Sequence, residues 1–493
     1  MKIKLHFENV ILAVVIIVGV AFSIFQFVFN RSLWLDESYL ALNIMNRSYF
    51  ELLMPLDHNQ VAPILFLLIE KIFSSLMGYS EYGLRLLPLL SYWGAIYFLY
   101  KILKVLKLNI YIITLSLSLF VFNGTTIYYS SEVKQYMIDV LVITCMFYLV
   151  LKNYDSIISK YLLIGIIGVL SIFLSNVSPI ILLCSGAFLF YNNFRSKRKE
   201  FWLIIIVSFI WSVYFVIYYR FYIYDHPIKE YMLDYWTKAG AFMPTNPFNI
   251  EFYQFIIGKY YIYYLYLFDF GWIGFYGLQM LFLLGCYNLM EKRKLDILAI
   301  GIAPIIVHLI LSSFKLYPFD LRLILYTSAA FLIILSFGLE QVYDFFVKLN
   351  MRSIRLLFVP VILYFIIIGY SKLPIERSES KKSFAYLRQN IIENDKIYFT
   401  YFSKFPLQYY KRISKINFPI NNAYYGKAAE EDVFIEEVDA LNGRVWFVFS
   451  DFINEDRRLL FTLKERFNDK KHLLLKEYHA RGSSVLLYEI MQK

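Results

Sequence analysis

The feature that most limits how this chain can fold is the recurrence of long apolar segments. Windows of about 18 to 23 residues, each able to cross the roughly 30 Å hydrocarbon core of a bilayer, recur between residues 9 and 371. A soluble fold could not bury a sequence that is 59% hydrophobic and only 18% charged. The chain is therefore predicted to be a polytopic α-helical membrane protein with about eleven spans. The windows are 9–29, 82–104, 109–127, 134–151, 161–177, 178–194, 201–219, 271–290, 296–313, 321–343 and 354–371.

The net charge of +11 does not indicate a nucleic-acid partner, because most basic residues lie in short runs between apolar windows. The three cysteines, Cys145, Cys184 and Cys286, lie inside apolar windows without paired spacing. Neither a disulfide framework nor a zinc site is indicated.

The same basic runs predict the orientation of the chain in an inner (plasma) membrane. The run 9–29 is too long for a signal-peptide core and lacks a small-residue cleavage site before Asn30, so it reads as a retained signal anchor with a cytoplasmic N-terminus. If the short apolar segment 61–78 lies along the outer surface, every basic cluster between spans is cytoplasmic, as the positive-inside bias requires. A twelfth span at 61–78 is the alternative, and it would reverse this parity. The clusters are 101–107, 152–160, 195–199, 292–294 and 348–355.

The composition changes sharply after residue 371. Polar residues follow, and then helix-like stretches alternate with short β-type runs at 396–402, 444–449 and 484–488. We therefore expect two domains, a transmembrane domain at 1–371 and a small soluble α/β domain at 372–493, which lies outside the cytoplasm if eleven spans precede it.

Four polar segments then fall on the outer side, where ionisable residues of a membrane protein suggest a functional site. We expect these segments to face one cavity, with the long 220–270 loop acting as a mobile lid. The segments are 30–60 with the adjoining 61–81 helix, 128–136, 220–270 and 315–322.

The first polar segment begins with two adjacent carboxylates, Asp36 and Glu37. Neighbouring residues of a helix point about 100° apart, so only one of the two can address a reacting atom. The structural alternative is that Asp36 caps a helix running to about Met45, with Glu37 in its first turn.

Two cations occur where later spans begin. Lys134 and Arg322 could each hold an anionic phosphate at headgroup depth, where water is scarce. The alternatives are a snorkelling lysine balanced by Glu132 and an arginine that anchors its helix at the interface.

Further candidate ligands for a sugar or phosphate lie nearby in the sequence. His58, Asn59 and Gln60 could supply hydrogen bonds, although a turn is an equally good reading. His308 lies within a span and reads as a packing residue. Glu132, Tyr136 and Asp139 complete the candidate substrate-binding set.

The order of these motifs over residues 30 to 340 resembles the GT-C glycosyltransferases of the protein O-mannosyltransferase and aminoarabinose transferase superfamily. The resemblance is carried by Asp36-Glu37, 59–66, 78–88, 129–139 and 317–322. The chain has Asn59-Gln60-Val61-Ala62-Pro63 where aminoarabinose transferases have Glu-Lys-Pro-Pro-Leu, so lipid A modification does not follow from the resemblance.

The resemblance implies transfer of a sugar from a polyprenyl-phosphate donor to a glycan, lipid or protein acceptor at the outer face of the membrane. Asp36, or its neighbour Glu37, is then the general base, and Lys134, Arg322 and Arg85 stabilise the departing phosphate. No cofactor is required by this reading, and a divalent metal is left open.

Two other classes of protein compete with this interpretation. A transporter or flippase should show ionisable residues near the bilayer midplane and corresponding halves, whereas the charges here collect at membrane edges. A non-catalytic envelope assembly protein with an outer domain is the third reading.

Overall fold

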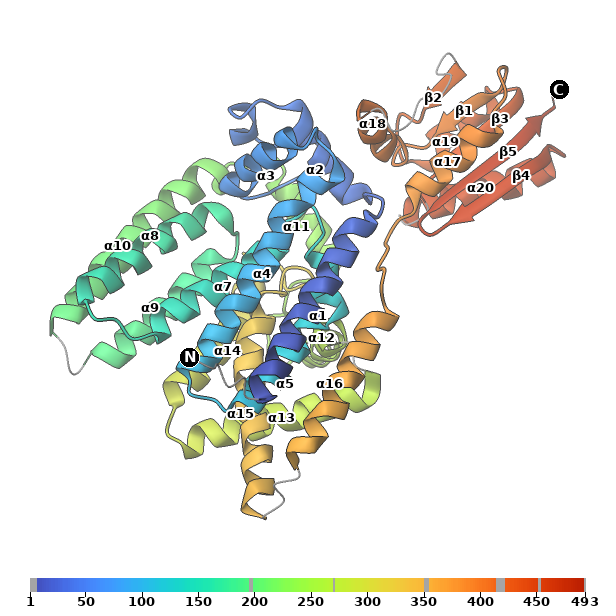
Figure 1. The fold of residues 1–493 in the computed structure, drawn as a ribbon. Helices are drawn as coiled ribbons and strands as arrows, with labels where there is room; N and C mark the ends of the chain where they lie inside the picture. The colour runs from blue at the N-terminus through green and yellow to red at the C-terminus, as the bar shows by residue number, and fades with distance from the viewer. Residues whose placement is uncertain are drawn as a thin grey trace.

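The computed structural model describes residues 7–194, 198–268, 271–349, 354–413, 422–450 and 454–491. Figure 1 shows a bundle of helices that carries a small sheet domain at one end. Three residues of the basic clusters that predicted orientation, 195, 197 and 352, lie outside the described residues.

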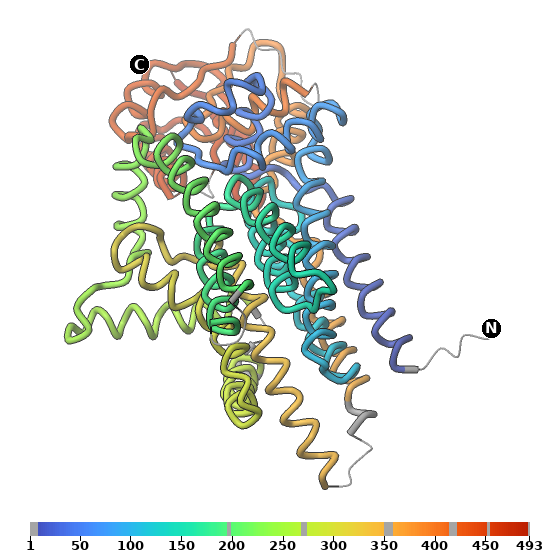
Figure 2. The backbone as a smooth tube through the Cα atoms, turned by 90° about the vertical axis from the view of Figure 1, so that its left-hand side faces the viewer, coloured from blue at the N-terminus to red at the C-terminus, as the bar shows by residue number. Residues whose placement is uncertain are grey.

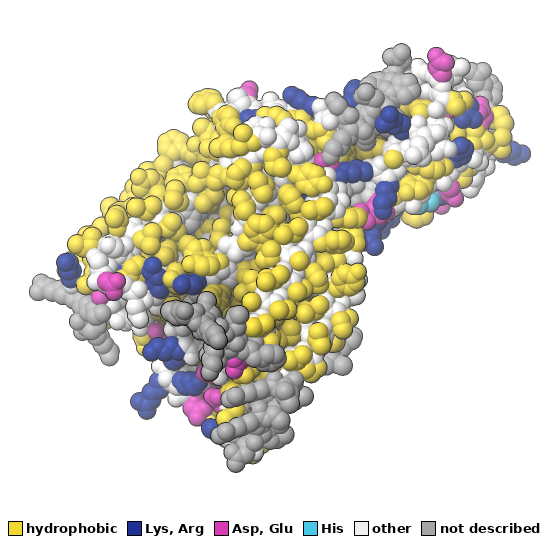
Figure 3. All heavy atoms as spheres, in the orientation of Figure 1, with side chains coloured by type: hydrophobic (Ala, Val, Ile, Leu, Met, Phe, Trp, Pro, Cys, Tyr) yellow, Lys and Arg dark blue, Asp and Glu magenta, His cyan; other side chains and the backbone are white. Residues whose placement is uncertain are grey.

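Each of the eleven apolar windows contains a helix. Among the described residues, six helices are long and apolar enough to cross a membrane, and further apolar helices are shorter. Hydrophobic side chains cover the face of the bundle in Figure 3. The predicted α-helical membrane fold class is confirmed. The helices are α1 (Phe7–Phe29), α4 (Glu81–Val105), α5 (Ile110–Val121), α7 (Tyr136–Leu151), α8 (Ile157–Leu174), α9 (Ser178–Asn193), α10 (Arg198–Tyr218), α13 (Gly271–Glu291), α14 (Leu295–Ser313), α15 (Thr327–Lys348) and α16 (Ile354–Ser371).

In two of the apolar windows the helix does not extend over the whole window. The window 109–127 is broken after Val121, because Asn123 accepts hydrogen bonds from the backbone of Thr125 (2.7 Å) and caps the separate helix α6 (Gly124–Tyr129). The window 321–343 forms turns up to residue 326, so Arg322 precedes α15 and does not begin it as expected.

Three short helices lie between α1 and α4, namely α2 (Leu35–Asn46), η1 (Glu51–Leu53) and α3 (Ile64–Leu76). Thirteen residues of α3 rise about 20 Å, too little to cross the hydrocarbon core. Lys71 of α3 is buried and donates to the Ile44 carbonyl of α2 at 2.8 Å. This packing agrees with the interpretation of 61–78 as a segment that does not cross.

Polar contacts tie the helices together at the end of the bundle farthest from the sheet domain. Lys160 pairs with Glu200 at 3.1 Å, and Lys292 pairs with Glu340 at 2.7 Å. Figure 2 shows α1 running from this end toward the sheet domain. The described basic clusters and the short helices α2 and α3 therefore occupy opposite ends of the bundle.

The expectation of a long loop at 220–270 is wrong. The segment forms η2 (Tyr219–Tyr224), α11 (Lys229–Lys238) and α12 (Ile250–Phe268). Aromatic residues surround α12 on all sides, which hides the 3.6-residue period that would have identified a helix. Asp225, placed in the lid by the sequence, pairs with Arg220 at the surface.

The C-terminal domain is an α/β sandwich. Its five-stranded sheet has the order β2-β1-β3-β5-β4, with β1 parallel to β2 and β3, and β5 antiparallel to β3 and β4. The three predicted runs correspond to β1, β3 and β5, whereas β2 is too short and β4 too exposed to be recognised. The elements are α17 (Ser380–Asn390), β1 (Lys396–Phe399), α18 (Lys404–Arg412), β2 (Ala423–Tyr425), α19 (Glu431–Asp439), β3 (Gly443–Phe449), α20 (Asn454–Asp469), β4 (Leu473–Ala480) and β5 (Ser483–Ile490).

Helix α18 docks this domain onto the part of the chain around the short helices α2 and α3. The Tyr410 hydroxyl accepts a hydrogen bond from the Leu33 amide at 2.8 Å, and the Tyr409 hydroxyl donates to the Tyr79 carbonyl at 2.9 Å. The Phe405 ring lies 4.7 Å from the ring of Tyr39 on α2. The C-terminal domain therefore packs directly beside the residues that follow the first span.

Helices α13 and α15 pack with their backbones in close approach, and this yields a first prediction. A Cβ on Gly285 would lie 2.1 Å from the Ile334 carbonyl oxygen, so Gly285→Ala must separate the helices. We expect a loss of about 1–3 kcal/mol, measured as a lower thermal unfolding midpoint in detergent. Gly277→Ala on the same helix is the control, since nothing lies within 4 Å of its Cβ position. Equal midpoints for the two variants would contradict this packing.

Candidate active site

The site begins where α1 ends and the chain reverses into α2. Asn30 adopts a left-handed conformation (φ 52°) and terminates α1. Trp34 precedes α2, and its amide donates to Glu37 Oε2 at 3.3 Å. Asp36 is the second residue of the helix, so the alternative that it caps the helix is wrong, although the helix ends at Asn46 and has Glu37 in its first turn, as that alternative expected.

Glu37 points into the protein and forms a buried ionic cluster. Its carboxylate accepts two hydrogen bonds from Arg31, at 2.6 and 3.1 Å, and one from the Val133 amide at 2.9 Å. Arg85 of α4 lies 3.4 Å away, and all three charged side chains are at most 1% exposed. Burial alone would raise the pKa of Glu37, but Arg31 and Arg85 lower it. This cluster joins α2, α4 and the turn before α7.

Glu37 and Arg85 do not lie where the roles suggested by the sequence would require. Glu37 was a candidate base and Arg85 a candidate phosphate ligand. Arg85 instead donates to the Arg31 carbonyl at 2.8 Å and stands beside Glu37 beneath the surface. Both residues are placed to position α2.

Asp36 points the other way, toward two cations. Arg322 Nη1 lies 2.6 Å and Lys134 Nζ 3.5 Å from Asp36 Oδ2. The Gln60 side chain bridges the two groups. Its Nε2 donates to Asp36 Oδ1 at 3.2 Å, and its Oε1 accepts a hydrogen bond from Lys134 Nζ at 2.6 Å. These four side chains come from segments far apart in the sequence. The prediction that Asp36 and Glu37 face different environments agrees with this geometry.

The charged groups in this cluster shift the pKa values of their neighbours. Burial alone would raise the pKa of Asp36, but Lys134 and Arg322 hold it well below its usual range. Burial lowers the pKa of the Lys134 ammonium, and Asp36 opposes that effect. The Asp36 side chain is 20% exposed, so the carboxylate is reachable from outside.

Aromatic rings surround Arg322. Its guanidinium lies 5.9 Å from the ring centroids of Trp34 and Tyr136 and 5.6 Å from that of Trp236. Cation–π contacts of this kind hold a guanidinium in place without consuming its hydrogen bonds. Arg322 is therefore positioned by packing and can exchange its polar partner.

The remaining predicted ligands separate into two groups. The Glu132 carboxylate is buried and accepts from Trp34 Nε1 at 2.9 Å and from the Tyr128 hydroxyl at 3.2 Å, directly behind the site. Asp139 lies farther along α7 and accepts from Ser175 at 2.6 Å.

The three candidate ligands at 58–60 do not lie together in the structure. His58 and Asn59 form a turn with left-handed backbone (φ 60° and 53°), in line with the turn interpretation. The His58 ring stacks on Tyr39 at 5.0 Å, and only Gln60 enters the Asp36 cluster.

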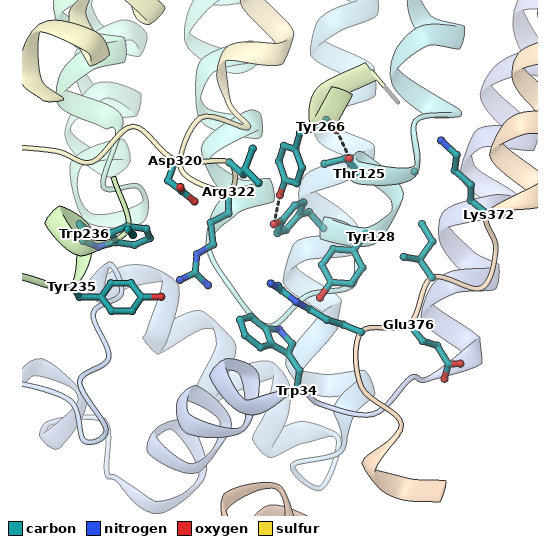
Figure 4. Close-up of a pocket in the computed structure, with 16 residues that line it drawn as sticks. Trp34, Thr125, Tyr128, Tyr235, Trp236, Tyr266, Asp320, Arg322, Lys372 and Glu376 are labelled. Atoms are coloured by element: carbon teal, nitrogen blue, oxygen red, sulfur yellow. Dashed lines mark hydrogen bonds between the residues drawn. The ribbon is translucent and has the colours of Figure 1, made fainter. Parts of the chain in front are cut away.

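A cavity of about 730 Å³ opens on one side of Arg322. In Figure 4 Trp34, Tyr128, Tyr235, Trp236 and Arg322 point toward a common space. The sequence placed the segments that carry these residues at one cavity but did not identify the aromatic side chains as its wall, since composition does not reveal which rings turn inward. The cavity is lined by Trp34, Gly124, Thr125, Tyr128, Tyr129, Tyr235, Trp236, Ala239, Tyr266, Asp320, Leu321, Arg322, Lys372, Ile375, Glu376 and Arg377.

The sequence did not decide whether the site holds a divalent metal ion. Within the described ranges, no three His, Cys, Asp or Glu side chains come close enough together to hold a metal ion.

Comparison with known proteins identifies the fold. No protein-family model and no curated protein matches the chain. ArnT from Cupriavidus metallidurans in the apo state matches with 11% identity over 97% of each chain and a TM-score of 0.53. ArnT from Cupriavidus metallidurans bound to undecaprenyl phosphate matches with 11% identity over 97% of each chain and a TM-score of 0.51. The chain has the GT-C fold of ArnT, as the sequence resemblance predicted.

The two neighbouring carboxylates should respond differently to mutation. Glu37→Ala leaves Arg31 and Arg85 buried without their anion, which costs about 3–5 kcal/mol. We expect a much lower thermal unfolding midpoint and less folded protein by size-exclusion chromatography. Asp36→Asn, at a partly exposed position, should unfold close to wild type. A Glu37→Ala variant as stable as Asp36→Asn would show that the buried cluster does not hold α2.

Proposed function

We propose that this protein is a membrane glycosyltransferase that moves a sugar from a polyprenyl-phosphate donor to a hydroxyl group of an acceptor. The observation that carries the proposal is one carboxylate, Asp36, held by Arg322 and Lys134 (2.6 and 3.5 Å) beside an aromatic cavity of about 730 Å³. The GT-C fold shared with ArnT, one structure of which is bound to undecaprenyl phosphate, supports a lipid-linked donor.

Lys134 and Arg322 are the phosphate ligands in this proposal. Both side chains are largely buried, at 6% and 19% exposed, so little water screens their charge. The guanidinium offers two parallel N–H groups to a phosphate, and the ammonium adds a point charge. Arg322 lines the cavity and also contacts Asp36, so the donor enters from the cavity and the acceptor reaches Asp36 from the other side.

The reaction is a single displacement. Asp36 accepts the proton of the acceptor hydroxyl while that oxygen bonds to the anomeric carbon. The bond from the anomeric carbon to the phosphate oxygen breaks, and its electron pair leaves with the polyprenyl phosphate. Lys134 and Arg322 stabilise the negative charge that grows on the phosphate, which is a transition-state interaction. Lipid phosphate is a good leaving group, so a second carboxylate as general acid is not required.

Donor binding also prepares Asp36 for its role. In the donor-free protein, the two cations keep the pKa of Asp36 too low for an effective base. A donor phosphate competes for Arg322 and Lys134 and weakens their attraction for the carboxylate. The proton affinity of Asp36 therefore rises when the donor is in place.

The cavity walls suit the rest of the donor. Trp236 and Tyr235 line the cavity and can stack on a sugar ring, and the hydroxyl groups of tyrosines can accept or donate hydrogen bonds. Gln60 bridges Asp36 and Lys134 and fixes their orientation. Glu37 and Arg85 hold α2 so that Asp36 keeps its direction.

We further propose that the site lies at the outer face of the inner membrane. The described basic clusters occupy the opposite end of the bundle, and the positive-inside bias assigns that end to the cytoplasm. The N-terminus is then cytoplasmic, and the C-terminal domain is extracytoplasmic and lies beside the acceptor entry.

The decisive variant is Asp36→Asn in the full-length protein. Loss of the proton acceptor should lower the rate of sugar transfer about 10²–10⁴-fold. Radiolabelled transfer to envelope acceptors, measured at equal levels of folded protein, checks this. Unchanged transfer would favour a flippase or an assembly protein over an enzyme.

The pH dependence of kcat/KM tests the charge arrangement. A depressed pKa means that Asp36 stays ionised until the pH falls below the usual aspartate value of about 3.9. We therefore expect no acid limb from Asp36 between pH 7 and 5. Arg322→Gln removes one partner, raises the pKa of Asp36 and moves the acid limb toward neutral pH. An acid limb near pH 6 in the wild type would contradict this assignment.

A further inference from the structure

The linker between the two domains, residues 372–379, forms one wall of the cavity. It is anchored at both ends. The Gln26 side chain of α1 donates to the Ile375 carbonyl and accepts from the Ile375 amide, both at 2.8 Å. Lys381, just beyond the linker, pairs with Glu81 at 2.7 Å, and its amide donates to Ser32 Oγ at 3.1 Å. The path of the intervening residues is therefore set by the membrane domain.

Arg377 lies between these two anchors and faces the cavity. Its guanidinium carbon is 3.8 Å from the centroid of the Trp34 ring, and Nη1 is 3.7 Å from Glu132 Oε1. Arg322 approaches the same indole ring at 5.9 Å. Two guanidinium groups, one from the linker and one from the turn before α15, thus lie beside the same indole ring and line a single cavity.

The charges around this cavity are unequal. Six cations, Arg31, Arg85, Lys134, Arg322, Lys372 and Arg377, lie in its wall or in the ion clusters beside it with three carboxylates, Asp36, Glu37 and Glu132, an excess of three positive charges. The two other acids of the cavity wall have cations close by, Asp320 with Lys259 at 3.4 Å and Glu376 with Lys382 at 3.7 Å.

Glu132 is the carboxylate that pairs with Arg377. Burial, followed by the nearby charge of Glu37, raises the pKa of its carboxyl group. Its Oε2 atom is buried without a hydrogen-bond partner among the described residues.

This excess matches a phosphate that gains charge during the reaction. A sugar phosphodiester carries one negative charge, whereas a phosphate monoester carries about 1.5 to 2 at neutral pH. An array with surplus positive charge therefore binds the departing polyprenyl phosphate better than the intact donor, which is the difference that accelerates a reaction.

We propose that Arg377 is a third ligand of the donor phosphate, delivered to the site by the interdomain linker. This inference rests on the proposed function and extends it. Arg322 and Arg377, which both lie beside Trp34, hold the phosphate together with Lys134. Because the linker carries Arg377, phosphate binding depends on how the C-terminal domain is attached to the membrane domain.

The alternative role for Arg377 is to neutralise Glu132 and nothing more. The two roles predict different effects of Glu132→Gln on phosphate affinity. If Arg377 binds phosphate, removing the Glu132 charge releases Arg377 and tightens phosphate binding. If Arg377 serves only Glu132, then Arg377→Ala and Glu132→Gln disturb the same pair, and neither changes phosphate affinity specifically.

The experiment measures binding of undecaprenyl phosphate, and of undecaprenol as the phosphate-free control, to the full-length protein in detergent. Arg377→Ala should weaken undecaprenyl phosphate binding about tenfold to a hundredfold and leave undecaprenol unchanged. Arg377→Lys should recover part of the loss, and Glu132→Gln should tighten binding. Arg388→Ala, an exposed arginine on α17, is the matched control and should bind as wild type.

Two results would overturn the inference. One is an Arg377→Ala variant that binds undecaprenyl phosphate as wild type does, while Arg322→Gln still weakens it. The other is equal weakening by Arg377→Ala and Glu132→Gln. If Arg377→Ala does not fold, the comparison between Arg377→Lys and Glu132→Gln decides by their opposite signs. Failure of the proposed function looks different, since the wild type would then bind undecaprenyl phosphate no better than undecaprenol.

Discussion

The buried ion cluster of Glu37 with Arg31 and Arg85 is the interaction on which the site depends. It joins the start of α2 to α4 and to the turn before α7, all with almost no solvent exposure. A buried charge is costly without its partners, so this arrangement allows only one register of α2. The next residue back, Asp36, is consequently turned about 100° away, toward Lys134 and Arg322.

The site as a whole is organised by competition for a few cations. In the proposed mechanism, Asp36 holds the cations that the donor phosphate would bind, and Arg322 is surrounded by aromatic rings that do not satisfy its hydrogen bonds. A site of this design is stable when empty because its charges are paired. It also responds to an anion, because exchanging Asp36 for phosphate changes the basicity of the carboxylate. The linker adds Arg377 to the same cavity and so connects the C-terminal domain with the chemistry.

Much of the membrane domain could be predicted because its signals are local. Apolar windows identified the helices, and the sequence also predicted strands β1, β3 and β5. The errors have physical causes. The segment 220–270 was taken for a loop because its aromatic residues obscure helical periodicity, and Arg322 was assigned to a helix start although turns precede α15. Tyr235 and Trp236 lie in that segment and line the cavity, but no sequence pattern singled them out.

The sequence by itself determined that the chain is a helical membrane protein with a small α/β domain, and that only one carboxylate of Asp36 and Glu37 could face a reacting atom. Those conclusions follow from hydrophobicity and helix geometry, which act over a few residues. Only the tertiary structure decided which carboxylate faces the cations and that Arg85 lies beneath the site. It alone also brought Gln60, Arg322 and Arg377 to one place, because contacts between segments hundreds of residues apart depend on packing and charge pairing that no local pattern records.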